Sequence, residues 1–133
     1  LPLLERIAPG VEPPVAYRVG ADAPRIVRRE APLEGAYEEA ARLAGEEGLL
    51  AVVVPGSLRG AGDLGLFDET RIAVLTPREA KGMEFDHVIV AEPALIVEEG
   101  RERGLRELYV ALTRPTTTLV VVHSRPLPQE LGL

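Results

Sequence analysis

The sequence predicts an α/β domain built on a mainly parallel, doubly wound sheet. Short apolar runs alternate along the chain with stretches whose apolar residues recur at helical spacing, which is the order of strands and helices in such sheets. One run, residues 49–54, is apolar throughout. Such a run is expected for a strand that is buried on both faces of a parallel sheet.

The amino-terminal third is predicted to contain a lead-in, a strand and a helix. Residues 1–23 are interrupted by prolines and glycines, and we expect them to be irregular. A candidate strand follows at 25–30. From Leu33 to Ala44 the apolar residues recur at helical spacing, and Gly48 is the expected stop. The predicted domain therefore spans residues 24–133.

The remaining elements follow in the same alternation. Residues 55–70 contain four glycines and are predicted to be a loop with at most one helical turn. We then expect strands at 71–75, 87–91 and 117–123. A short helical turn should follow the first of them, a loop or short helix should continue to Gly100, and a helix should span 104–114.

Composition restricts the class of protein. The chain has 133 residues, of which 46% are apolar and 27% charged, as in a single soluble globular domain. Its net charge of −6 argues against non-specific nucleic-acid binding by the chain alone, which normally requires a basic surface. Any contact with a strand should be local and should depend on a partner domain.

The chain has no cysteine, which excludes disulfides and thiolate metal sites and fits a reducing compartment. No apolar run approaches the roughly 20 residues of a membrane span, and no signal-peptide pattern is present. The expected location is therefore cytoplasmic, without a membrane partner. The two histidines, His87 and His123, fall on different strands and are not expected to bind metal.

The segment 76–86 has the first pattern that suggests chemistry. It follows a predicted strand and opens a turn of helix, and such a junction is where open α/β sheets bind anionic ligands. Gly82 would let the backbone approach a ligand closely. Glu84 offers a carboxylate that could accept hydrogen bonds from a ribose hydroxyl.

The second pattern ends at Arg114. Leu105, Leu108 and Leu112 have the spacing of one helical face, and Pro115 is a natural stop for that helix. Arg114 would then project from a helix terminus. A rigid, permanently charged guanidinium in such a place can stabilise the charge that develops on a γ-phosphate during phosphoryl transfer.

These two segments resemble motifs of a known family. Lys81–Asp86 resembles motif V, and Tyr109–Arg114 resembles motif VI, of the UvrD/Rep-type superfamily 1 helicases. The order, the spacing and the following strand at 117–122 also match, and the resemblance covers roughly residues 24–124. It implies a three-layer RecA-like domain, related to P-loop NTPases but lacking the phosphate-binding loop, and the second of two such domains.

The resemblance also implies roles for individual residues. ATP with Mg²⁺ would bind between this domain and an N-terminal RecA-like domain of the same protein. Arg114 would act as an arginine finger, and the nucleotide would also contact Gly82, Glu84 and Lys81. The isolated chain should be inactive, because it has no Gly-x-x-x-x-Gly-Lys-Ser/Thr loop and no acidic strand end for magnesium.

Thr76 and Arg78 are the implied contacts to single-stranded DNA. Arg78 stands where the family often has a histidine, so a donor for phosphate is kept and a stacking ring is lost. The family's motif IV arginine is also missing, because Tyr17–Arg18 does not fit its context. We therefore expect the chain to start downstream of motif IV, and residues 55–70 leave no room for the accessory domain of larger helicases.

Other interpretations remain open. Residues 78–82 and 114–116 resemble most closely the HelD-like branch of this family, whose members act on RNA polymerase. A non-catalytic RecA-like module that binds a protein partner is a further alternative. Arg114 could simply cap its helix, Thr76 could cap a helix start, and Glu84, Lys81 and Arg78 could be solvated surface residues.

Overall fold

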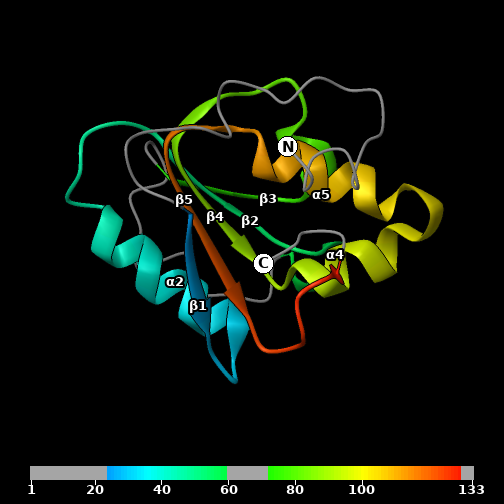
Figure 1. Cartoon of the computed structure of the whole chain (residues 1–133). Coiled ribbons are helices and arrows are strands. Elements are labelled where there is room, and N and C mark those ends of the chain that lie inside the picture. Colours follow the sequence, from blue (N-terminus) through cyan, green and yellow to red (C-terminus); the bar gives the residue numbers. More distant parts are fainter. Residues whose placement is uncertain (1–23, 60–71, 130–133) are drawn as a thin grey trace.

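The computed structural model describes residues 24–59 and 72–129. The predicted lead-in at 1–23 and residues 60–71 of the predicted loop lie outside them. The described part forms a five-stranded sheet in the order β1-β5-β4-β2-β3, and all four strand pairs are parallel (Figure 1). The predicted parallel α/β fold is confirmed.

The strands are β1 (Arg25–Arg28), β2 (Leu50–Val53), β3 (Ile72–Leu75), β4 (Phe85–Ala91) and β5 (Pro115–His123). The helices are α2 (Pro32–Leu43), α3 (Pro77–Ala80), α4 (Pro93–Gly100) and α5 (Gly104–Leu112). Two single 3-10 turns, η2 (Gly56–Leu58) and η4 (Arg101–Arg103), complete the described elements. No described helix has the length and apolar character that a membrane span requires.

The molecule has three layers. All four residues of β2 are buried, as predicted for a central strand, and they alternate between two core clusters. One cluster joins the sheet to Ala36 and Ala40 of α2. The other joins it to α3, α4 and α5 on the opposite face, through residues such as Ile96 and Leu108. Figure 1 shows α2 on one side of the sheet and α4 and α5 on the other.

The junction of α5 and β5 differs from the prediction. The helix ends at Leu112 rather than at Arg114, and β5 begins at Pro115 rather than at Thr117. Pro115 disfavours helical backbone in the residue before it, and a proline is tolerated as the first residue of a strand. Arg114 therefore lies in the short connection between the helix and the strand.

The topology separates the two ends of the motif V segment. Thr76 follows the carboxyl end of β3, whereas Glu84 precedes the amino end of β4. β3, β2, β4 and β5 are all parallel, so they begin at one end of the sheet, called here its amino edge, and finish at the other, its carboxyl edge. Glu84 and Arg114 therefore lie at the amino edge, and Thr76 lies at the carboxyl edge. The candidate site residues of this segment therefore lie at both ends of the strands and not at a single strand end.

Candidate functional site

Arg114 is held by backbone and side-chain acceptors of its own domain. Its Nε donates to the Val110 carbonyl oxygen at 3.0 Å, and Nη1 donates to the Met83 carbonyl oxygen at 3.3 Å. Its Nη2 donates to Thr113 Oγ1 at 3.2 Å. The contact with Val110 is the helix-capping contact that the alternative interpretation expected. A guanidinium carries five N–H groups, so two remain for a ligand.

The same residue joins the two motifs. The Phe85 amide donates to the Arg114 carbonyl oxygen at 3.2 Å, and Phe85 pairs with Pro115 where β4 meets β5. The Thr116 hydroxyl donates to the Phe85 carbonyl oxygen at 3.4 Å. Motif V and motif VI are therefore contiguous at the amino edge of the sheet, although they are far apart in the sequence.

Gly82 shapes the turn that precedes β4. Its φ is +80°, in the left-handed region that favours glycine. A Cβ atom placed there would meet nothing within 4 Å, so the backbone conformation, and not lack of space, favours glycine. The Met83 amide closes the turn by donating to the Ala80 carbonyl oxygen at 3.0 Å.

Lys81 and Glu84 flank this turn, and both are exposed. Neither side chain makes an ion pair or hydrogen bond within the described residues, which leaves both available to a ligand. Met83, between them, is 44% exposed. One short turn thus contains Gly82, Glu84 and Met83, whose carbonyl oxygen accepts a hydrogen bond from Arg114.

Thr76 has a structural role at the other end of the segment. Thr76 Oγ1 accepts a hydrogen bond from the Glu79 amide at 3.3 Å, and Glu79 Oε1 accepts one from the Thr76 amide at 3.0 Å. This reciprocal pair is a capping box. The helix start that the sequence suggested as an anion site is thus capped by its own residues.

Glu79 is further bound by Arg59, which donates from Nε and Nη2 at 2.7 and 2.9 Å. This paired hydrogen bond and the backbone bond from Thr76 lower the pKa of Glu79 from 4.5 to about 2. The side chain remains 41% exposed, so water weakens the interaction. Arg59 and Glu79 link the end of η2 to α3.

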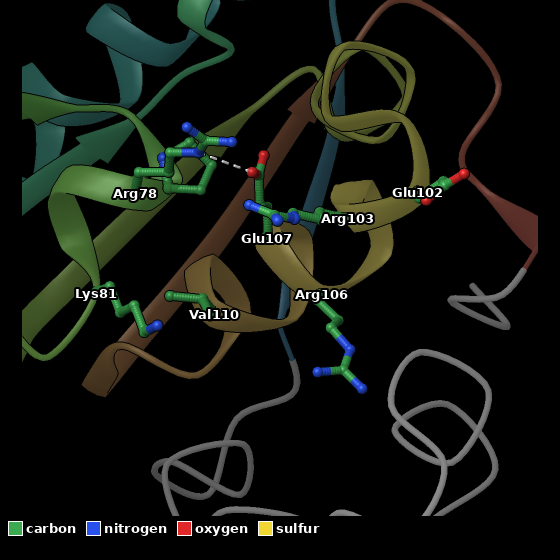
Figure 2. Close-up of a pocket in the computed structure, with 8 residues that line it drawn as sticks. Arg78, Lys81, Glu102, Arg103, Arg106, Glu107 and Val110 are labelled. Carbon is green, nitrogen blue, oxygen red and sulfur yellow. Dashed lines mark hydrogen bonds and ion pairs between the residues drawn. The ribbon is translucent and has the colours of Figure 1, made fainter.

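An open groove of about 740 Å³ runs between α3 and the start of α5. It is lined by Pro77, Arg78, Lys81, Glu102, Arg103, Arg106, Glu107 and Val110. In Figure 2 the side chains of Arg78 and Glu107 point toward each other, and their Nε and Oε1 atoms are 3.1 Å apart. Four lining residues are basic and two are acidic, so the lining has a net charge of +2 in a chain of −6.

Arg103 and Arg106 were not singled out from the sequence. Arg103 ends η4, just before α5 begins. Arg106 lies on the face of α5 opposite its buried leucines, and its spacing from Leu108 was the available signal. Neither has an ion-pair partner within the described residues. They bring two further cations to the groove that contains Arg78 and Lys81.

Glu92 is a second residue that sequence reasoning missed. It is only 2% exposed and has a left-handed φ of +50° after the end of β4. Its carboxylate accepts hydrogen bonds from the Ser124 amide at 3.1 Å, from the Arg125 amide at 3.2 Å and from the Ser124 hydroxyl. Glu92 therefore ties the exit of β5 to the start of α4, a structural role at the edge opposite Arg114.

Two glutamates near the end of α4 contact connecting segments. Residues 98–100 belong to α4. Glu98 pairs with Arg125 at 2.5 Å, and Glu99 accepts a hydrogen bond from the Ser57 amide at 3.1 Å. These acids hold connecting segments against α4.

Both histidines contact backbone oxygens. His87 is 5% exposed and its Nε2 lies 2.9 Å from the Glu47 carbonyl oxygen. His123 Nδ1 lies 2.8 Å from the Arg125 carbonyl oxygen. Within residues 24–59 and 72–129, no group of three or more histidine or acidic side chains is arranged to hold a metal ion.

Comparison with known proteins agrees with the two motifs. Residues 71–122 match the family model of the UvrD-like helicase C-terminal domain. This part of the chain is similar to the C-terminal domain of UvrD-like helicases. The matched residues include the whole of motif V and motif VI, and the resemblance drawn from those motifs is confirmed.

A solved structure extends the likeness to the whole fold. It is the C-terminal domain of a possible DNA helicase from Lactobacillus plantarum WCFS1, with a TM-score of 0.65 and 22% identity. The alignment covers 98% of this chain and 87% of that one. A search of curated proteins found no match. The predicted three-layer RecA-like fold is therefore confirmed.

Proposed function

We propose that this UvrD-like domain is the second RecA-like half of an ATP-dependent superfamily 1 motor that acts on DNA. The observation that carries the proposal is the position of Arg114. Its guanidinium is bound by the Met83 carbonyl of motif V and by the Val110 carbonyl and Thr113 hydroxyl of motif VI. Two of its five N–H groups have no acceptor among the described residues. An arginine held in this way is suited to bind an anion presented by a facing domain.

ATP with Mg²⁺ would bind in the cleft between the two domains. The N-terminal RecA-like domain would supply the phosphate-binding loop and the metal ligands. Arg114 would stabilise the charge on the γ-phosphate in the transition state, an effect worth roughly 10³–10⁵ in rate for arginine fingers. Glu84 would accept hydrogen bonds from the ribose, and Gly82 and Lys81 would shape the same edge.

DNA would contact the adjoining groove between α3 and α5, which Lys81 also lines. Arg78 lies in the basic groove between α3 and α5, and Thr76 begins the helix that forms one wall of that groove. Phosphates of single-stranded DNA would be the ligands of such a groove. Closure of the two domains on ATP, and opening after hydrolysis, would shift this groove relative to the other domain and move the protein along the strand.

The contacts of Arg114 with its own helix also favour a competing function. An arginine that only caps α5 would suit a RecA-like module that binds a protein partner without catalysis. The residues at 78–82 and 114–116 separately favour a HelD-like ATPase that remodels RNA polymerase.

ATP turnover by the full-length protein, with and without single-stranded DNA, separates these functions. The proposed motor is expected to hydrolyse ATP faster when the strand is added. Turnover without stimulation by the strand would favour the HelD-like function. No turnover in a folded, nucleotide-supplied full-length protein would contradict the motor and favour the non-catalytic module. The isolated chain is the matched control, and we expect no turnover from it.

A further inference from the structure

Thr113 lies against the guanidinium of Arg114 and is only 5% exposed. Its hydroxyl donates to the Val110 carbonyl oxygen at 3.1 Å and accepts from Arg114 Nη2 at 3.2 Å. The same carbonyl accepts from Arg114 Nε at 3.0 Å. The hydroxyl, the carbonyl and the guanidinium therefore form a closed ring of three hydrogen bonds at the end of α5.

We propose that Thr113 is the positioning residue for the arginine finger, an inference that rests on the proposed function. The ring fixes Nε and Nη2, and the Met83 carbonyl fixes Nη1. One N–H group on Nη1 and one on Nη2 then remain to donate to the oxygens of a phosphate. Thr113 touches no reacting atom in this arrangement and acts only through Arg114.

The hydroxyl is the part of Thr113 that this role requires. It uses its hydrogen to bond the Val110 carbonyl and its lone pair to accept from Arg114, and a methyl group can do neither. Without it, Nη2 would lose its partner and the long arginine side chain would regain other rotamers. Fewer molecules would then hold Arg114 in the geometry that the transition state needs.

Thr113→Val in the full-length protein tests this role, because valine keeps the shape and removes the hydroxyl. We expect kcat for ATP hydrolysis to fall about tenfold, the loss typical of one hydrogen bond to a charged group, with little change in KM. Thr113→Ser is expected to restore kcat to within about twofold, because serine retains the same two hydrogen bonds. Thr116→Val is the matched control, since the Thr116 hydroxyl bonds a backbone carbonyl and does not touch Arg114.

A double-mutant cycle with Arg114→Ala separates positioning from general structure. If Thr113 acts through Arg114, Thr113→Val should cause no further loss in the Arg114→Ala background. An equal loss in both backgrounds, or a wild-type kcat for Thr113→Val, would overturn the inference. Thr113→Ala provides a second hydroxyl-free variant if the valine variant does not fold, and the same outcomes apply to it. Unchanged turnover in Arg114→Ala alone would instead contradict the proposed function.

Discussion

At the scale of single residues, the contacts of Arg114 are compatible with both roles that the sequence posed as alternatives. Its Nε caps the end of α5 at the Val110 carbonyl, while Nη1 reaches the Met83 carbonyl of the other motif. Since two N–H groups remain after these contacts, capping does not exclude phosphate binding. The capping contacts restrict the side chain before any ligand arrives, which lowers the entropy lost on binding.

Glu79 leads to a pH prediction at the same scale. Its pKa is lowered to about 2 in the folded chain by the hydrogen bonds from Arg59 and Thr76. A lowered pKa contributes stability that is present above the unfolded value of about 4.5 and is lost as the pH falls toward 2. Glu79→Gln should therefore be less stable than the wild type at pH 7, and the difference should shrink below about pH 4.5. Urea unfolding of both chains across this range measures it.

A difference that stays constant from pH 7 to pH 3 would contradict this linkage. Glu38→Gln is the matched control, because Glu38 is 63% exposed and lies 3.8 Å from its partner Arg29. The control should change stability little at any pH.

Sequence reasoning found some of the site residues and missed others for physical reasons. Arg114 was found because it ends motif VI, and Gly82 because a glycine favours a tight turn. The structure places Arg114 against the motif V turn, in which Gly82 has a positive φ. Thr76 is a helix cap in the structure, because the short side chain at a strand end bonds its own helix. Glu92 and Arg106 gave little signal, because their surroundings depend on segments that are distant in the sequence.

At the scale of elements, the central strands were predictable and the helix ends were not. The apolar run that contains β2 predicts a strand buried on both faces. This prediction depends only on the residues of the run and needs no knowledge of tertiary contacts. The end of α5 depends on Pro115 and on its pairing with Phe85, which is a tertiary contact. The sequence likewise left open a loop or a short helix before Gly100, and the structure has a helix of eight residues there.

Gly104 controls how closely α5 approaches α4. A Cβ atom at this position would lie 2.0 Å from the Val97 carbonyl oxygen, a backbone atom that cannot move aside cheaply. Gly104→Ala should therefore lower the free energy of unfolding by about 1–3 kcal/mol, although alanine favours helix more than glycine. Urea unfolding tests this.

Gly45→Ala is the control for this substitution, because a Cβ atom there meets nothing within 4 Å. The alanine variant at Gly45 should be as stable as the wild type or slightly more stable. Equal stability of the Gly104 variant and the wild type would show that the two helices are not packed as described.

At the scale of the whole molecule, the two proposed sites lie at one end of the strands and on one face of the sheet. The amino edge of the sheet holds the Arg114 turn, and the face covered by α3 and α5 holds the basic groove. The opposite face is covered by α2. A domain that uses a shared cleft at one edge and a strand on one face can couple the two by rigid-body motion.

The groove leads to a prediction about salt dependence. Arg103→Glu combined with Arg106→Glu should weaken DNA binding by the full-length protein. The change reverses two cations beside the proposed strand path, neither of which has an ion-pair partner among the described residues. The slope of log K against log salt should decrease by about 2 if each arginine contacts one phosphate. Fluorescence anisotropy with a labelled single strand measures this.

The matched control reverses Arg28 and Arg29, which are exposed at the end of the edge strand β1 and change the net charge equally. It should alter affinity only slightly and leave the slope close to that of the wild type. Equal weakening in both variants would mean that net charge, and not the groove, governs binding.

The most direct test of the central claim is ATP turnover by the full-length protein with Arg114→Ala. If Arg114 is the arginine finger, kcat should fall by at least about a hundredfold while nucleotide binding is retained, because a finger acts mainly on the transition state. Turnover equal to the wild type in a folded Arg114→Ala protein would contradict the claim. Arg114 would then be a helix cap that joins motif V to motif VI.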